Sequence, residues 1–399
     1  MENSFELSLD ALKPEARLLL CCARMQIDAD TARQINVLLK ESIDWDALLQ
    51  LAVAHDVAAL LYRTLESVSP SAMPPAVRAH LKRQMQVDIQ GNLALTKELV
   101  RVQALFDEAG IAMIPYKGPV LAASVYRDLA ARPFTDLDIL VPENDIPQAV
   151  ELLISMGYQI IRPKSLTQAR KSLQSLWLQQ LVKHSPWSYQ IVLWHPDLKT
   201  MVEIHWRVMS KYIFSSNAKQ LWEDLQPISL AGSNVHSLSP ESLLWFLCVH
   251  ASKHQWERLR WLCDIAELLR AYPHLNWNKV LEQAVHLKIQ RRPYIGLLLA
   301  HRLLGAPFPA AIAEKIHQIP QLRNLAQHAI DGLFEEQKQR FLNIPELRFQ
   351  LNSMDRLSDR VRYFLRYFND LETVVTIERK LVKPFSLLSL SSPFLRRFQ

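Results

Sequence analysis

Scarcity of glycine is the feature that most constrains what this chain can fold into and bind. The 399 residues include 8 glycines, where an average usage of about 7% would give close to 30. No two of them stand at the spacings G-x-G-x-x-G or G-x-x-x-x-G-K-[ST], which excludes dinucleotide-binding loops and Walker-type phosphate loops. A nucleotide site in this chain must therefore use side chains and metal instead of a glycine cradle.

The overall composition is that of a folded globular chain. Hydrophobic residues make up 49% of the sequence and charged residues 22%, which excludes intrinsic disorder and supplies enough apolar material for two or more packed domains. Lysine and arginine exceed aspartate and glutamate by 46 to 40, a formal net charge of +6. Because this excess is dispersed among acidic residues, it favours attraction of anions such as nucleotides but does not predict stable nucleic-acid binding.

Cysteine usage and hydropathy bear on the compartment. The four cysteines, Cys21, Cys22, Cys248 and Cys263, form neither a metal knuckle nor a regular disulfide framework, which favours reduced thiols. The apolar runs at 18–23 and 294–300 are too short for a signal sequence or for the roughly 20 residues that span a bilayer. We therefore expect a cytoplasmic protein without a transmembrane segment.

Hydrophobic periodicity divides the chain into four parts. Residues 1–98 are predicted as an N-terminal helical segment, residues 99–230 as an α+β core and residues 231–382 as a C-terminal helical domain. Residues 383–399 combine apolar side chains with lysine, arginine and two prolines, which predicts a basic, apolar tail that docks or frays instead of forming a membrane-surface helix. The predicted fold class is α+β, with a small mixed β-sheet core flanked by helical segments and mostly α overall.

The same patterns predict individual elements. Helices are expected at 14–25, 44–55, 57–67, 76–90, 93–109, 120–127 and 146–156. Strands are expected at 111–116, 137–141, 158–161, 189–194 and 200–206, the last two joined by a Pro-Asp turn. Further helices are expected at 242–253, 258–271, 277–288, 294–304, 310–318, 322–339 and 355–367. Gly110 and Gly157 are suited to ending the helices that precede two of the strands.

The strongest local signal is the segment Asp136-Leu137-Asp138. Residues two apart in a strand point to one face, so both carboxylates project together. Their repulsion beside an apolar strand favours binding of a divalent cation, and oxygen ligands suit Mg²⁺. The alternative is an exposed strand end with two solvated aspartates. If both are ligands, relief of their repulsion predicts that Asp138→Asn leaves the stability of the metal-free protein unchanged or raised.

A second signal is the strand 201–206, in which Glu203 and His205 share one face and apolar side chains share the other. A carboxylate in the middle of so apolar a strand favours a partner. If this strand lies beside that of Asp138, Glu203 becomes the third carboxylate of a metal site. The alternative is an edge strand with a solvated face.

Two cations stand close to these carboxylates in the sequence. Lys117, with Gly118 and Pro119 after it, marks a junction between strand and helix, where a lysine and helix N-terminal amides can contact phosphate. Arg132 lies four residues before Asp136. The alternative for both is a solvated surface cation.

A polar stripe follows in the C-terminal part. On a helix, His250, Lys253, His254, Trp261 and Asp264 fall on one face. This set is too polar for a simple core face, so it predicts a helical wall over a site, with Lys253 or His254 meeting phosphates. Polar packing between helices is the alternative. A zinc site at the two histidines is disfavoured because the zincin glutamate is missing.

Together these motifs resemble the polymerase-β-like nucleotidyltransferase superfamily, in particular its bacterial branch of nucleotidyltransferase family proteins. The resemblance spans about residues 95–270. It is carried by Lys117-Gly118, Leu121, Tyr126, Arg132, the segments 136–141 and 202–206, and the block from His250 to Asp264. Where the wider superfamily has Gly-Ser and a third aspartate, this chain has Lys117-Gly118 and Glu203.

The resemblance implies transfer of a nucleoside monophosphate from an NTP, with ATP expected, to a hydroxyl-type acceptor and release of pyrophosphate. The acceptor is left open among a small molecule, a peptide and a protein. Two Mg²⁺ ions are expected as cofactors. The implied site comprises metal ligands (Asp136, Asp138, Glu203), nucleotide contacts (Lys117, Gly118, Arg132, Lys253, His254) and a substrate wall (His205, His250, Trp261, Asp264).

Two other classes of function are compatible with the sequence. One is a catalytically idle relative that serves as an interaction module through its long helical flanks. The other is a nucleic-acid-binding protein, which only the basic pI of about 9.1 favours. Mg²⁺-dependent binding of an NTP separates the enzyme from the first, and steep salt dependence of nucleic-acid retention would identify the second.

Overall fold

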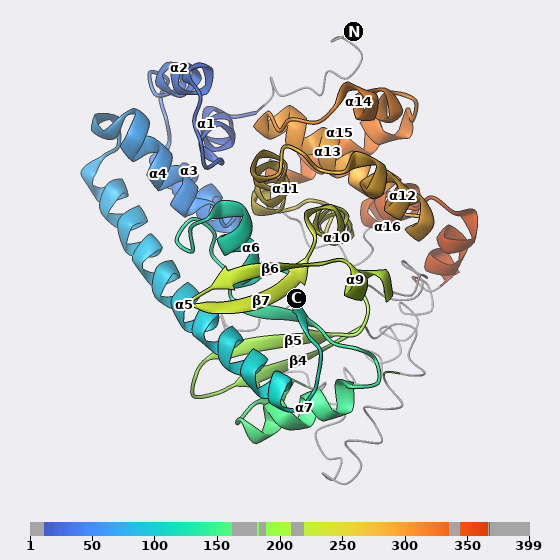
Figure 1. The fold of residues 1–399 in the computed structure, drawn as a ribbon. Helices are drawn as coiled ribbons and strands as arrows, with labels where there is room; N and C mark the ends of the chain where they lie inside the picture. The colour runs from blue at the N-terminus through green and yellow to red at the C-terminus, as the bar shows by residue number, and fades with distance from the viewer. Residues whose placement is uncertain are drawn as a thin grey trace, which may run out of the picture.

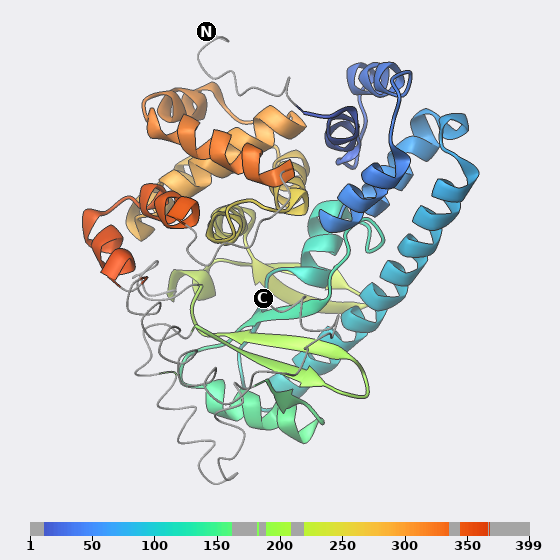
Figure 2. The same cartoon turned by 180° about the vertical axis from the view of Figure 1, so that it is seen from behind.

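Two groups of helices stand over a small mixed sheet in the computed structural model of the chain (Figures 1 and 2). The structure describes residues 12–161, 182, 189–208, 219–334, 344–365 and 367. The predicted tail at 383–399 lies outside these residues, as do residues 335–339 of the helix predicted at 322–339 and residue 366 of the helix predicted at 355–367. The predicted α+β class, mostly helical with a small mixed sheet, is confirmed.

The N-terminal part is helical, as predicted. Its elements are α1 (Pro14–Cys22), α2 (Ala29–Leu38), α3 (Trp45–Ala54), α4 (Ala58–Val68), the 3₁₀ turn η2 (Pro70–Ala72) and α5 (Pro75–Glu108). Local sequence explains the starts of several: Asp44 caps α3 by accepting from the backbone amides of Asp46 and Ala47. Helix α2 was not predicted. The two helices predicted at 76–90 and 93–109 are one, because Gly91 is accommodated within α5 without a break.

The central sheet has five strands in the order β1-β2-β5-β4-β3. They are β1 (Ile114–Pro115), β2 (Asp136–Leu140), β3 (Gln159–Ile160), β4 (Gln190–His195) and β5 (Thr200–His205). Strands β2 and β5 are parallel, and the other neighbours are antiparallel. The predicted strands at 111–116 and 158–161 are shorter than expected, whereas the hairpin of β4 and β5 is confirmed.

The two faces of this sheet differ in chemistry. Leu137 and Ile139 of β2 and Val202 and Ile204 of β5 are buried in a core with α5 and α7 (Ile146–Ser155). Alternation along the strands then places Asp138 and Glu203 on the opposite face. That face is the one on which the candidate site is built.

A second hairpin, β6 (Leu225–Leu230) and β7 (Ser233–Leu238), was not predicted from the sequence. It contributes only a few buried apolar residues to the core beneath the sheet, so its alternating pattern is weak. Ser237 Oγ donates a hydrogen bond of 2.6 Å to the carbonyl oxygen of Pro115 and so ties β7 to β1. The predicted domain boundary at 230/231 falls in the turn of this hairpin; the division into domains stays a prediction.

The C-terminal part consists of α9 (Lys219–Glu223), α10 (Pro240–Lys253), α11 (Leu259–Ala271), α12 (Trp277–Leu287), α13 (Arg291–Leu304), α14 (Ala310–His317), α15 (Gln321–Phe334) and α16 (Ile344–Ser353). Of these, α9 and α16 were not predicted. A single large apolar core joins α10, α11 and α13 to the N-terminal helices and to part of the sheet. Helix α10 contacts β7 of the second hairpin, and α11 packs on α10 (Figure 1). Among the described residues, no helix has the length and apolar character needed to cross a membrane.

Candidate active site

The site begins where β2 and β5 lie side by side. Asp138 and Glu203 are opposite each other in the parallel register. His205 Nε2 lies 3.2 Å from Asp138 Oδ1 and 3.4 Å from Glu203 Oε2. Burial disfavours the charged form of the His205 ring, but its contacts with the two carboxylates outweigh burial and raise its pKa.

Asp136 lies two residues before Asp138 on β2, and both line one cavity. Burial, followed by the negative charges of Asp138 and Glu203, raises the pKa of Asp136 to about 6. The predicted projection of the two aspartates to one side is therefore what the structure has. The three carboxylates share a single electrostatic environment, in which Asp136 carries the unfavourable charge.

Lys117 reaches the carboxylates from the junction between β1 and α6 (Gly118–Leu121). Gly118 has φ of +51°, and a Cβ there would stand 3.3 Å from the carbonyl oxygen of Asp136, so glycine is required at this turn. Lys117 Nζ lies 3.4 Å from Asp138 Oδ1. Although burial opposes ionisation of Asp138, the charges of Lys117 and His205 hold its pKa below the ordinary value.

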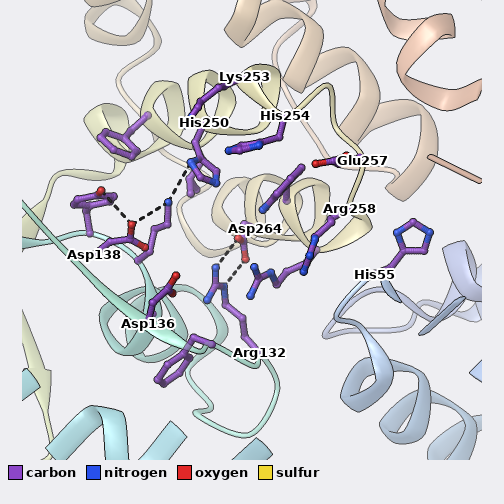
Figure 3. Close-up of a pocket in the computed structure, with 18 of the residues that line it drawn as sticks. His55, Arg132, Asp136, Asp138, His250, Lys253, His254, Glu257, Arg258 and Asp264 are labelled. Atoms are coloured by element: carbon purple, nitrogen blue, oxygen red, sulfur yellow. Dashed lines mark hydrogen bonds and ion pairs between the residues drawn. The ribbon is translucent and has the colours of Figure 1, made fainter. Parts of the chain in front are cut away.

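The predicted polar stripe on α10 and α11 faces these strands across the cavity (Figure 3). His250 Nδ1 lies 3.2 Å from Lys117 Nζ; because an ammonium group only donates, this nitrogen accepts and the ring is neutral. The rings of His250, His254 and Trp261 lie 5.1–5.6 Å apart between centroids. Burial and then the charge of Lys253 lower the pKa of His254 to about 3.

Arg132 and Asp264 form a buried bidentate pair between the core and α11. Arg132 Nε and Nη2 donate to the two carboxylate oxygens of Asp264 at 2.7 and 2.9 Å. Tyr126 at the end of the π-helical turn η3 (Ala122–Tyr126) donates to Asp264 Oδ1 at 2.8 Å. Against the cost of burial, Asp264 raises the pKa of Arg132, so the guanidinium stays charged. Arg132 is therefore not a solvated surface cation, which was the alternative interpretation. Its carboxylate partner, Asp264, belongs to the predicted polar stripe.

All twelve residues predicted for the site line a single cavity of about 800 Å³, which brings them together. They are Lys117, Gly118, Arg132, Asp136, Asp138, Glu203, His205, His250, Lys253, His254, Trp261 and Asp264.

 Gly118 has no side chain and borders the cavity through its backbone. The whole predicted set therefore meets in one place.

Further residues line this cavity that the sequence did not single out. Tyr116 and Phe246 stack at 4.3 Å between ring centroids beside Asp138, and Gln190 Nε2 donates to Glu203 Oε2 at 2.9 Å. Gln190 could have been found by counting back from the predicted Pro-Asp turn, which puts it opposite His205. Arg260 also lines the cavity, but no local sequence pattern indicates it. Its hydrogen-bond partner, the carbonyl oxygen of Pro133, lies more than a hundred residues away in the sequence.

The cavity extends beyond the carboxylates to the N-terminal helices. His55 at the end of α3 and Phe334 at the end of α15 lie edge to face with 5.5 Å between ring centroids. Arg258, next to α11, donates to Asp56 Oδ2 at 2.6 Å. The site is consequently enclosed by three parts of the chain, which are the strands, the C-terminal helices and the end of α3.

The carboxylate face fits a divalent cation. Asp138, Glu203 and His205 each offer a ligand atom, and these atoms lie within 4.8 Å of one another. This group contains His205, which was predicted for the substrate wall, in place of Asp136. The raised pKa of Asp136 reflects burial and negative charge from its neighbours, and a cation would relieve that charge. Carboxylate oxygens are the ligands that Mg²⁺ prefers.

Comparison with known protein families agrees with this geometry. A family model described as "Uncharacterised nucleotidyltransferase" matches residues 41–305. That match covers more than half of the chain and includes every residue of the predicted site. The chain belongs to this nucleotidyltransferase family. Comparisons with curated proteins and with solved structures found no match.

Proposed function

We propose that this chain is a Mg²⁺-dependent enzyme that transfers a nucleoside monophosphate from an NTP, with ATP expected, to a hydroxyl group and releases pyrophosphate. Membership of a nucleotidyltransferase family supports the general class. The observation that carries the proposal is the pairing of Asp138 with Glu203 on parallel strands, inside a cavity whose opposite wall holds Lys253. Acidic and basic walls facing each other suit a metal-bound polyphosphate.

Within this proposal, Asp136, Asp138 and Glu203 hold two Mg²⁺ ions. When bound, the metal neutralises phosphate charge and lowers the pKa of the acceptor hydroxyl. Glu203 accepts the hydroxyl proton, and the hydrogen bond from Gln190 keeps its carboxylate oriented. The acceptor is a small molecule, a peptide or a protein.

The basic residues act on the nucleotide. Lys117, Arg132 and Lys253 offer positive charge to the phosphates, and neutral His254 offers a ring nitrogen as a hydrogen-bond donor. Gly118 lets the backbone turn so that Lys117 faces Asp138. His205, His250, Trp261 and Asp264 complete the wall and hold these groups in place.

One observation favours a catalytically idle interaction module as the second candidate. Lys117 and His205 already lie within 3.4 Å of Asp138 Oδ1, so the charge of this carboxylate is balanced within the protein. In an idle relative these contacts would persist and no metal or NTP would bind.

Thermal unfolding separates the two candidates. We expect Mg²⁺ with an NTP to raise the melting temperature of the wild type, since a ligand at 100 times its Kd stabilises a protein by about 2.7 kcal/mol. Asp138→Asn should abolish this stabilisation. Asp197→Asn, a matched change in the exposed turn between β4 and β5, should retain it. Equal stabilisation of Asp138→Asn and wild type would remove the proposed metal site.

Turnover is tested with each labelled NTP, Mg²⁺ and a cell extract, followed by mass analysis of whatever acquires the label. A nucleoside monophosphate adduct that the wild type forms and Asp138→Asn does not would establish transfer and identify the acceptor. Absence of any adduct, together with absence of NTP-dependent stabilisation, would favour the interaction module.

A further inference from the structure

Buried polar contacts hold the backbone of Arg132 and one edge of its guanidinium group. The side-chain amide of Asn92, on α5, donates to the carbonyl oxygen of Arg132 at 2.9 Å, and its oxygen accepts from the amide of Phe134 at 3.2 Å. Asp264 holds two of the guanidinium nitrogens, and Tyr126 holds Asp264. Both the loop and the side chain are therefore placed before any ligand arrives.

The third guanidinium nitrogen has a different environment. Arg132 is 3% exposed and lines the cavity, yet its Nη1 makes no hydrogen bond within the part of the chain that the structure describes. Leaving a buried charged donor unsatisfied is costly. An arginine has five donors in a planar fork, and those not used by Asp264 suit the oxygen atoms of an anion.

A second arginine, from helix α11, contacts the loop that carries Arg132. Arg260, in the first turn of α11, donates from Nη1 to the carbonyl oxygen of Pro133 at 2.8 Å. Its Nε makes no hydrogen bond among the described residues and lies 3.7 Å from Asp56 Oδ2. Arg132, Asp136 and Arg260 line the same cavity, and the charges of both arginines act on Asp136, so the two guanidinium groups lie near the carboxylate at the start of β2.

Lys253 occupies the other side of the cavity. Its ammonium group donates to the hydroxyl of Tyr189 and lies 4.8 Å from the centroid of that ring. Tyr189 immediately precedes β4, next to the Gln190 that contacts Glu203. Lys253 is thus engaged on the Glu203 side, whereas Arg132 and Arg260 stand on the Asp136 side.

The geometry points to a two-arginine phosphate site, in which Arg132 and Arg260 bind the pyrophosphate portion of the nucleotide beside Asp136. This inference rests on the proposed function and deepens it by assigning the β- and γ-phosphates to one wall. Asp264 acts as a positioning residue, because it directs the fork of Arg132. The Glu203 side, where Lys253 lies, is left for the α-phosphate and the acceptor.

Inorganic tripolyphosphate, which lacks a base and a sugar, is the direct probe. Its affinity for the full chain would be measured by titration calorimetry, with EDTA and separately with Mg²⁺. We expect binding to the wild type and at least a tenfold loss in Arg132→Lys and in Arg260→Lys, because lysine keeps the charge but not the planar fork. Arg63→Lys, in the exposed ion pair with Asp128, should bind as the wild type does.

Arg260→Lys is the deciding variant if Arg132→Lys fails to fold, since the Arg260 side chain is 19% exposed and less dependent on burial. Wild-type affinity in Arg260→Lys under both conditions would overturn the proposal, as would failure of the wild type to bind in either. Asp264→Asn should weaken binding several-fold; unchanged affinity with a lowered melting temperature would make Asp264 structural only.

The source of the phosphate is tested by competition. We expect a non-hydrolysable NTP to displace tripolyphosphate, whereas simultaneous binding would assign the arginines to a phosphorylated acceptor and overturn the proposal. The result is separable from the proposed function, because Asp138→Asn should keep tripolyphosphate binding in EDTA while losing Mg²⁺-NTP stabilisation. If tripolyphosphate binding depends on the arginines but Mg²⁺-NTP does not raise the melting temperature, the proposed transferase function is refuted and the anion site is retained.

Discussion

At the scale of single residues, the two aspartates of β2 are not equivalent. From the sequence, the mutual repulsion of Asp136 and Asp138 predicts that Asp138→Asn is neutral or stabilising. In the structure, Asp138 has Lys117 and His205 in contact, so its carboxylate is favoured in the folded protein. Asp136 carries the unfavourable charge instead. The gain in stability is therefore expected for Asp136→Asn and not for Asp138→Asn.

Asp136→Asn should stabilise the metal-free protein at pH 8 by up to about 3 kcal/mol, since each pKa unit is worth about 1.4 kcal/mol. Burial and neighbouring carboxylates raise the pKa of Asp136 to about 6. Its ionised form thus opposes folding above that pH, and the opposition vanishes below the unfolded pKa near 4. The gain should shrink as the pH falls from 6 to 4.

Urea denaturation in EDTA across this pH range measures the effect. Asp138→Asn is the paired control and should show the opposite sign, a loss of stability at neutral pH, because it removes an ion-pair partner of Lys117. A stability gain in Asp138→Asn with none in Asp136→Asn would contradict this assignment of charge.

At the scale of elements, the turn that carries Lys117 depends on glycine. Gly118→Ala should destabilise the protein by about 1–2 kcal/mol, because Gly118 has φ of +51° and a Cβ would meet the carbonyl oxygen of Asp136 at 3.3 Å. Gly91→Ala is the matched control within α5, where a Cβ meets nothing within 4 Å. It should stabilise the protein by up to about 1 kcal/mol, since alanine is the better helix former.

Chemical denaturation of both alanine variants gives these values. A neutral Gly118→Ala would mean that the turn adapts freely. In that case, the position of Lys117 would have to be set by its contacts with Asp138 and His250 alone.

Elements with strong local patterns could be predicted from the sequence, and those that depend on distant partners could not. Alternation along β2 and β5 identified the faces of Asp138 and Glu203, because the period of two belongs to the strand itself. The pairing of these strands is non-local, so it could be stated from the sequence only as a condition, and their parallel direction was not predicted. The hairpin of β6 and β7 was missed because it buries few apolar side chains.

At the scale of the whole molecule, the site is assembled from segments far apart in the chain. The pairing of Arg132 with Asp264 joins residues separated by 132 positions, and no local pattern indicates it. Sequence reasoning placed both residues in one site but gave them separate roles. Burial and hydrogen bonding, which only the three-dimensional arrangement defines, combine them into one unit.

Because several segments enclose the cavity, a nucleotide bound there should suppress local opening of its walls. We expect Mg²⁺-NTP to slow amide hydrogen exchange several-fold over residues 251–260, between α10 and α11, where His254, Arg258 and Arg260 line the cavity. Helix α14, none of whose residues lines the cavity, is the internal control and should be unaffected. Protection confined to the strands would show that the C-terminal helices take no part in binding.

Helix α5 gives the molecule a mechanical property of its own. Its 34 residues make a rod about 51 Å long at 1.5 Å per residue. One end packs on α4, and the other packs on β2 and α7 (Figure 1). Because α5 also contacts α3, it connects the α3 wall of the cavity to the strand that carries Asp136 and Asp138. Gly91 lies near the middle of α5 and, as a glycine, is the position where this helix bends most easily. A residue with a Cβ at this position would meet nothing within 4 Å. It would therefore stiffen the connection between the two walls of the cavity without making a new contact.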